Sequence, residues 1–380
     1  MAFTGLKPEY IHVRIGATVP FADQEADLIH YRLGHGEPRA LIMAGVHGWE
    51  HGGVQAAYEL LERLATRPLR GRIDILPVCN PMAYAAESRF TPHSERNMTL
   101  AFTPGPPQDL TEALSQAVLA LAKGTEIVLN LHSAGPARYL PHVMFYRPED
   151  AEWAASLGLP FAIMPCGLDD MPDHIAARLQ PEQRTVTLEL GGGIVAYPED
   201  VVVGVEAILA LLGRSGFLEP GDYEREPTPP ELIYMYDARL FVRAPAEGAF
   251  YTQARLGADF SQGEPFGSWV PLEGSLSLQP QPVLCPEPVE GLCPELCPES
   301  IEGLAEGLAP ETGKINRSQK LAADCQIRCQ TAGFGNPAGA NRDLLKLIYL
   351  RTRNRVSQGE TLAMFLPHQS DEERSNGTCL

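Results

Sequence analysis

Residue types that bind zinc gather in the segment 44–53, which has the sequence AGVHGWEHGG. His47 and Glu50 lie three residues apart, among glycines and directly after an apolar run. Imidazole nitrogens and carboxylate oxygens are common zinc ligands, and a catalytic zinc ion uses three protein ligands and keeps a fourth position open. The segment therefore predicts two ligands of one catalytic zinc ion per chain, with the third ligand supplied from elsewhere.

Two further polar residues stand at the ends of apolar runs. His132 follows EIVLNL (126–131), and Glu189 lies near the end of TVTLEL (185–190). We interpret His132 as the third ligand and Glu189 as the general base that takes a proton from the attacking water. The alternatives are a core histidine at 132 and a salt-bridged carboxylate at 189, because a buried charge needs a partner or a function.

The same ten residues contain a second metal motif. His47-Gly-Trp-Glu50-His51 has the spacing H-x-x-E-H, which places two histidine ligands on a helix. Glycine costs about 1 kcal/mol per helical position relative to alanine, and four glycines oppose a helix here, at positions 45, 48, 52 and 53. We therefore expect a turn, with His51 only a neighbour of the site.

The elements that must position these residues follow an alternating pattern. Four apolar runs have the length of buried strands: 40–46, 73–78, 126–131 and 185–190. Three segments have apolar residues at helical spacing: 54–65, 110–122 and 201–212. This pattern predicts an α/β fold with a mixed, mostly parallel sheet and helices on both faces. Ligands bind at the carboxyl ends of such strands, which is where the candidate residues fall.

The pattern changes after about residue 219. Short strands and Gly-rich turns at 240–251, 263–274, 344–350 and 356–365 predict a small C-terminal β-domain. We expect a catalytic domain over 1–225 and a β-domain over 226–367. We also expect a low-complexity insertion at about 278–335 and a disordered tail at 368–380.

The expected insertion is repetitive and acidic. Its part 282–313 contains seven Glu, six Pro, three Cys and no basic residue, and CPEPVEGL from Cys285 recurs as CPESIEGL from Cys297. Such a composition buries too little apolar surface to offset its chain entropy. The cysteine pairs 293/297 and 325/329 approach zinc-ribbon spacing, but we expect no structural zinc there because the repeat dictates the first pair.

The composition of the chain limits the kinds of partner that it can bind. The 380 residues include 30 Lys+Arg and 48 Asp+Glu, a formal charge of −18, which opposes a nucleic-acid or anionic-membrane partner. No run of 18 apolar residues and no secretory pattern is present, and eight cysteines are too few for a disulfide scaffold. We expect a cytoplasmic protein that acts on a small molecule, and a homo-oligomer is compatible with this composition.

In their order along the chain, these motifs resemble the succinylglutamate desuccinylase/aspartoacylase family of the zinc carboxypeptidase-like clan. The similarity spans roughly 30–225 and rests on His-Gly-x-Glu after a strand, Asn80-Pro81, Arg89, Leu-His132 and Thr-x-Glu189-x-Gly-Gly. The resemblance implies a zinc carboxypeptidase-like fold followed by a β-domain. It also implies a deacylase that hydrolyses a linear amide of a small N-acylated, amino-acid-like substrate, with Arg89 polarising the scissile carbonyl.

The chain departs from the family where the substrate is recognised. Thr99 and Leu100 stand where the family has an Asn-Arg pair that clamps a substrate carboxylate. Leucine cannot replace the bidentate guanidinium, so either Arg96 and Asn97 bind the substrate or the substrate lacks that carboxylate. Two alternatives stay open: a zinc peptidase of the same clan, which the lost clamp opposes, and a degenerate binding protein. Asn130, in place of the family's Asp two residues before His132, favours the second of these.

Overall fold

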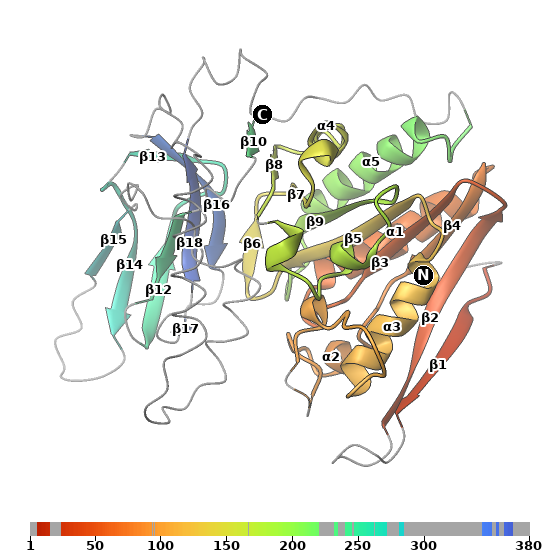
Figure 1. Cartoon of the computed structure of the whole chain (residues 1–380). Helices are drawn as coiled ribbons and strands as arrows, with labels where there is room; N and C mark the ends of the chain where they lie inside the picture. The colour runs from red at the N-terminus through yellow and green to blue at the C-terminus, as the bar shows by residue number, and fades with distance from the viewer. Residues whose placement is uncertain are drawn as a thin grey trace. The chain divides into compact units, whose positions relative to one another are not determined.

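A computed structural model (Figure 1) describes residues 6–15, 24–92, 94, 96–165, 167–219, 232–234, 240–244, 247–261, 263–271, 281–284, 344–351, 355–356 and 361–367. The chain divides into two compact units, Met1–Met235 and Tyr236–Leu380. The boundary expected near 225, the cysteine pairs and the tail from 368 lie outside the described residues. Within these residues, no helix is long and apolar enough to cross a membrane.

The first unit is built on one mixed sheet with the strand order β1-β2-β4-β3-β5-β9-β7-β8-β10. Its strands are β1 (Glu9–Ile15), β2 (Gln24–His35), β3 (Arg39–Ala44), β4 (Gly71–Leu76), β5 (Ile127–Ala134), β6 (Ala137–Tyr139), β7 (His142–Phe145), β8 (Phe161–Ile163), β9 (Arg184–Gly192) and β10 (Leu232–Tyr234). The four strands expected from the sequence are β3, β4, β5 and β9, and they form the parallel centre of the sheet.

Helices cover both faces of this sheet, as Figure 1 shows. The α-helices are α1 (His51–Ala65), α2 (Pro81–Ala85), α3 (Leu110–Ala122), α4 (Ala151–Ala155) and α5 (Pro198–Arg214). Helices α1 and α5 pack over one face in the larger apolar core, whereas α3 packs over the other face in a second core. The predicted fold class is therefore confirmed. The described residues of this unit also contain four 3-10 helices: η1 (Met98–Leu100), η2 (Pro148–Asp150), η3 (Leu168–Asp170) and η4 (Ile175–Arg178).

The alternation of side chains along the central strands decides which face carries the polar residues. In β5, Leu129 and Leu131 pack into the core under α1 and α5, whereas Val128 packs toward α3. Because successive side chains in a strand point to opposite faces, His132 lies on the α3 face with Val128. By the same alternation Glu189 of β9 lies on the α3 face, and it is the register partner of His132.

In the described residues of the second unit, all regular structure is β. Its strands are β11 (Leu240–Arg243), β12 (Gly248–Thr252), β13 (Asp259–Ser261), β14 (Pro265–Pro271), β15 (Gln281–Leu284), β16 (Leu344–Arg351), β17 (Arg355–Val356) and β18 (Thr361–Pro367). They form two ladders, β13-β16-β18-β11 and β15-β14-β12-β17. The segment 356–365, expected to continue the β-domain, contains the end of β17 and most of β18.

Four residues of the expected insertion belong to a β-ladder. Gln281–Leu284 forms β15, which pairs with β14. Pro282 made this segment look irregular. A proline is tolerated in an edge strand, because its missing N–H is not needed on the unpaired side, and β15 is the edge strand of its ladder. The remainder of the expected insertion, up to 335, lies outside the described residues.

Candidate metal centre

A turn between β3 and α1 presents the first two candidate ligands. Gly45 has φ +62°, a left-handed conformation that favours glycine, and α1 begins only at His51, with Glu50 as its N-cap residue. The helical interpretation of H-x-x-E-H is therefore wrong for this chain, because His47 and Glu50 precede the helix. The His51 ring instead contacts Tyr84, with ring centroids 5.3 Å apart.

Two glycines, Gly48 in this turn and Gly53 in the first turn of α1, are required by close packing. A Cβ on Gly48 would lie 1.9 Å from the carbonyl oxygen of Ala83, in α2. A Cβ on Gly53 would lie 2.6 Å from the carbonyl oxygen of Leu131, in β5. Both distances are far below van der Waals contact. The glycines therefore let the turn sit on α2 and let α1 approach the strand that carries His132.

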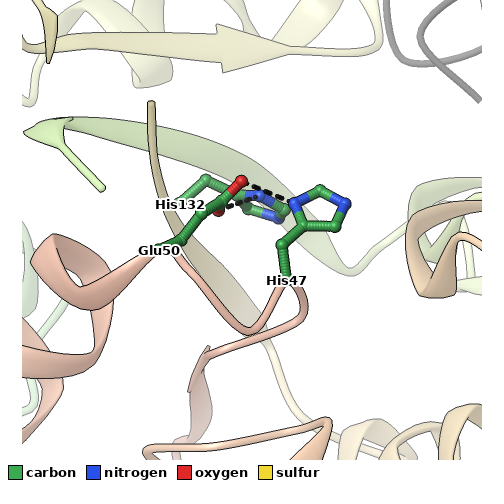
Figure 2. Close-up of side chains that lie close together, drawn as sticks. All are labelled: His47, Glu50 and His132. Atoms are coloured by element: carbon green, nitrogen blue, oxygen red, sulfur yellow. Dashed lines mark hydrogen bonds and ion pairs between the residues drawn. The ribbon is translucent and has the colours of Figure 1, made fainter. Parts of the chain in front are cut away.

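Figure 2 shows the three side chains converging from the turn and from β5. His47 Nδ1 lies 2.6 Å from Glu50 Oε1, and His132 Nδ1 lies 2.9 Å from Glu50 Oε2. The two imidazole rings meet edge to face, with centroids 5.0 Å apart. All three residues are at most 3% exposed, and the Ser133 N–H donates to Glu50 Oε2 at 3.2 Å.

The electrostatic environment favours the protonation states that bind metals. Burial lowers the pKa of His47, and the positive charge of Arg89 acts in the same direction. Burial alone would raise the pKa of Glu50, but His47 and His132 outweigh burial and hold that pKa below its usual value. A neutral imidazole and an ionised carboxylate are the forms that coordinate a cation.

These residues fit a zinc ion by the chemistry of their donors. One donor atom from each of His47, Glu50 and His132 lies within 4.8 Å of the others. Two nitrogens and one oxygen in this range match a three-ligand catalytic zinc site, in which metal–ligand distances are about 2.0–2.2 Å. The structure therefore brings together the three ligands that the sequence predicts, at the carboxyl ends of β3 and β5.

The far nitrogen of His47 has its own partners. Nε2 lies 3.0 Å from Asn97 Oδ1 and 3.0 Å from Thr99 Oγ1. If Nδ1 is the ligand atom, Nε2 carries the proton and donates it, which fixes both the tautomer and the ring orientation. We expected Asn97 to bind substrate, and the structure instead places its side-chain oxygen against a candidate ligand.

The contact from Thr99 was missed by sequence reasoning. The spacing Asn97-x-Thr99 is compatible with an N-cap, and Asn97 Oδ1 does accept from the Thr99 N–H at 3.0 Å at the start of η1. His47 precedes Asn97 by fifty residues in the chain, so only the fold brings the two side chains into contact.

Arg89 lies at the edge of the cluster. One of its guanidinium nitrogens is 3.9 Å from Glu50 Oε1, and its side chain is only 11% exposed. The preceding residue, Ser88, accepts a hydrogen bond from the Gly48 N–H at 2.8 Å. Asn80 caps α2 and donates to Thr91 Oγ1 at 2.9 Å, which secures the chain on both sides of Arg89.

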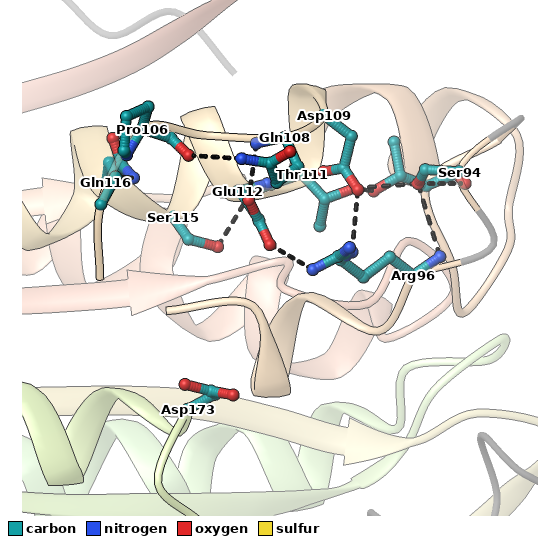
Figure 3. Close-up of polar contacts among 12 residues, drawn as sticks. Ser94, Arg96, Pro106, Gln108, Asp109, Thr111, Glu112, Ser115, Gln116 and Asp173 are labelled. Atoms are coloured by element: carbon teal, nitrogen blue, oxygen red, sulfur yellow. Dashed lines mark hydrogen bonds and ion pairs between the residues drawn. The ribbon is translucent and has the colours of Figure 1, made fainter. Parts of the chain in front are cut away.

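Arg96 has a different environment from the one expected. Its Nε lies 2.8 Å from Asp109 Oδ2, and a terminal nitrogen contacts Glu112. Figure 3 shows the side chain directed toward the start of α3, where Ser94 Oγ also meets Thr111 Oγ1 at 3.0 Å. Arg96 and Ser94 thus tie the segment that carries Arg89, Asn97 and Thr99 to α3.

Glu189 lies beside the ligand cluster without belonging to it. It is 7% exposed and occupies β9 at the level of His132. The group of three donors comprises only His47, Glu50 and His132 among the described residues. Asn130, two residues before His132 and on the same face, is 2% exposed.

The fold and the cluster define an α/β protein with three side chains that could hold a metal ion at the ends of its parallel strands. Residues 36–214 match the catalytic domain of the succinylglutamate desuccinylase/aspartoacylase family. This match covers most of the first unit, which therefore resembles a catalytic domain of this family. The enzyme class inferred from the sequence, a deacylase that hydrolyses a linear amide bond, is confirmed with it.

Three relatives illustrate the match. A curated protein from Halomonas elongata, N-alpha-acetyl-L-2,4-diaminobutyric acid deacetylase, is 29% identical over 236 residues, which are 60% of this chain and 69% of that protein. The succinylglutamate desuccinylase/aspartoacylase structure from Rhodobacter sphaeroides has a TM-score of 0.67 at 18% identity and covers 96% of both chains. The ectoine utilization protein EutE (DoeB) from Ruegeria pomeroyi, with bound product, has a TM-score of 0.65 at 18% identity over 96% of this chain and 99% of its own. The two structures support the fold alone.

Proposed function

We propose that this chain is a zinc-dependent deacylase that hydrolyses the N-acyl amide of a small amino acid derivative. The observation that carries the proposal is the convergence of His47, Glu50 and His132 on one point at the strand ends of a deacylase-family domain. A zinc ion held by these residues, one per chain, supplies Lewis-acid chemistry that activates water and polarises the amide carbonyl.

The remaining roles fall to residues beside this cluster. Glu189 takes the proton of the attacking water on a carboxylate oxygen and passes it to the leaving nitrogen. Arg89, whose guanidinium lies 3.9 Å from Glu50, stabilises the negative charge that develops on the carbonyl oxygen. Both side chains are largely buried, which strengthens their electrostatic effect.

For the substrate, we propose an N-acetylated diamino acid. According to its name, the curated relative from Halomonas elongata deacetylates N-alpha-acetyl-L-2,4-diaminobutyric acid. The placement of Arg96 against Asp109 and Glu112 opposes a second arginine clamp on a carboxylate, so a carboxypeptidase or a desuccinylase of a dicarboxylic substrate is disfavoured. We also propose a cytoplasmic location, in keeping with the buried free thiol of Cys79.

Metal analysis combined with an acyl-release assay tests this proposal. We expect near-stoichiometric zinc in the purified chain and its loss in His132→Ala, whereas His51→Ala should keep the metal because His51 contacts Tyr84 instead. The zinc-loaded protein should release acetate from N-acetyl-2,4-diaminobutyrate faster than it releases acetate from N-acetylaspartate or succinate from N-succinylglutamate. A wild-type chain that binds no zinc would refute the proposal.

A further inference from the structure

A β-bulge follows directly after Glu189. In the ladder between β5 and β9, Glu189 pairs with His132 and Gly192 pairs with Ala134. Between these two pairs, β9 has two residues and β5 has only one. Gly191 is one of the two, and its φ of +72° is a left-handed conformation that favours glycine. Because a bulge bends its strand and redirects the side chains beside it, the backbone at Gly191 affects where the Glu189 carboxylate points.

The carboxylate of Asp200 lies against this bulge. A Cβ on Gly191 would lie 2.0 Å from Asp200 Oδ2, so the carboxylate occupies the place that any side chain at 191 would need. Asp200 belongs to the first turn of α5, and its side chain is only 7% exposed. A carboxylate buried to this extent needs a charged partner.

Arg138 of β6 is that partner. Its Nε and a terminal nitrogen donate to the two oxygens of Asp200, at 2.7 and 2.8 Å, and such a bidentate pair has a defined geometry. The guanidinium carbon lies 4.0 Å from the centre of the Tyr197 ring, and a terminal nitrogen also reaches the exposed Glu199 at 2.8 Å. Arg138 is the register partner of Gly192 as well. It therefore joins the end of β9 to the start of α5.

We propose that Arg138 and Asp200 are positioning residues for Glu189, which rests on the role of Glu189 in the proposed function. Their ion pair fixes the conformation of Gly191, and the bulge in turn holds the Glu189 carboxylate beside the ligand cluster. Arg138 and Asp200 act through the backbone and exchange no proton with substrate. Since a displacement of about 1 Å can cost on the order of 100-fold in rate, loss of the ion pair should be visible in turnover.

Two substitutions remove the ion pair, one from each side. Arg138→Gln removes the positive charge, and Asp200→Asn removes the negative charge with almost no change of shape. With N-acetyl-2,4-diaminobutyrate as substrate, we expect each to lower kcat about 10- to 100-fold and to change KM by less than about twofold. Zinc content should be unchanged, because none of the three candidate ligands lies on β9. Arg138→Lys should recover part of the loss, because lysine keeps the charge but lacks the fork.

Arg70→Gln is the matched control. Arg70 also forms a bidentate ion pair, with Glu219 at 2.8 and 2.7 Å, but it directly precedes β4 and so lies at the amino ends of the parallel strands. The candidate ligands lie at the opposite ends. We therefore expect Arg70→Gln to keep wild-type kcat.

A double-substitution cycle with Glu189 separates positioning from a general effect on the fold. When Glu189→Gln has removed the base, adding Arg138→Gln should leave the residual kcat unchanged, because the two positions act as one unit. If Arg138→Gln lowers kcat by the same factor with and without Glu189, the ion pair serves the fold alone and the proposal is refuted. Wild-type kcat in Arg138→Gln and Asp200→Asn refutes it too. Full activity of Glu189→Gln would instead count against the proposed function.

Amide hydrogen exchange tests the ion pair without activity. In the purified protein, the amides of Gly191 and Gly192 should exchange faster in Arg138→Gln and Asp200→Asn than in the wild type, since local opening becomes easier. Arg70→Gln should leave exchange at these glycines unchanged. If Arg138→Gln does not fold, Arg138→Lys takes its place and should show a smaller increase. Wild-type exchange at both glycines in these variants would overturn the proposal.

Discussion

The ligand cluster and the segment 88–100 both bring charged side chains to the α3 face of the sheet, and they use them differently. In the cluster, two imidazoles surround the Glu50 carboxylate, and the donor atoms face one another. In the segment, Arg96 turns away to Asp109 and Glu112. The first arrangement leaves converging lone pairs that suit a cation, whereas the second neutralises its charge within the protein.

The partners of a charged residue therefore indicate whether it contributes to metal binding or to the stability of the fold. Buried side chains that offer lone pairs contribute little to the stability of the fold unless a cation binds to them. A partly exposed ion pair contributes modestly to stability and nothing to chemistry. Substitutions in the two regions should therefore separate cleanly, with catalytic and metal effects at one and stability effects at the other.

The largest effect is expected beside the cluster, at Glu189. Replacing the carboxylate by an amide in Glu189→Gln removes the proton acceptor but keeps the shape, so kcat should fall by about 10²- to 10⁴-fold. Zinc content should be unchanged, because Glu189 is outside the donor group. Steady-state kinetics with metal analysis measure both quantities, and Glu206→Gln, in α5 on the opposite face, is the matched control. Wild-type turnover in Glu189→Gln would remove Glu189 as the base.

The next effect concerns the support of the cluster by Asn97. Because Asn97 Oδ1 accepts from His47 Nε2 at 3.0 Å, Asn97→Ala should weaken zinc affinity about 10- to 100-fold. Competition with a chelator of known affinity gives this value. Asn97→Asp keeps the acceptor and adds charge, so it should bind zinc at least as tightly as the wild type. If both variants kept wild-type affinity while KM rose, Asn97 would be a substrate-binding residue, as its position in the sequence suggested.

In the segment 88–100, Arg96→Ala should act on stability and not on catalysis. Arg96 is 36% exposed whereas Glu112 is 4% exposed, so solvent screens part of the interaction and the loss should be about 1 kcal/mol. Thermal unfolding should show a lower Tm, with Arg96→Lys intermediate because lysine lacks the guanidinium fork. KM should stay within twofold of the wild type. A large rise in KM at unchanged Tm would reassign Arg96 to substrate binding.

The sequence predicts the cluster well because its members are held by the backbone. Apolar strands and glycines determine where His47, Glu50 and His132 emerge, and parallel strands deliver their ends to one edge of the sheet. The target of Arg96 was less predictable, because a long side chain can reach several partners. Asp109 and Glu112 are adjacent to it only through the packing of α3. The strand β15 was missed for a related reason: Pro282 and the repeat suggested an irregular segment, and only the partner strand β14 shows the pairing.

The smallest effect should come from Thr99, which stands where the family has an asparagine. Its hydroxyl and Asn97 Oδ1 are both 3.0 Å from the same nitrogen of His47, and that nitrogen has a single proton to donate. Thr99→Val keeps the shape and leaves Asn97 as the acceptor, so zinc affinity should fall less than about threefold, below the effect expected when a sole outer partner is lost. Chelator competition resolves such a change. A loss as large as that of Asn97→Ala would mean that Thr99 accepts the proton, and that the family's substrate-clamping position has become part of the metal site in this chain.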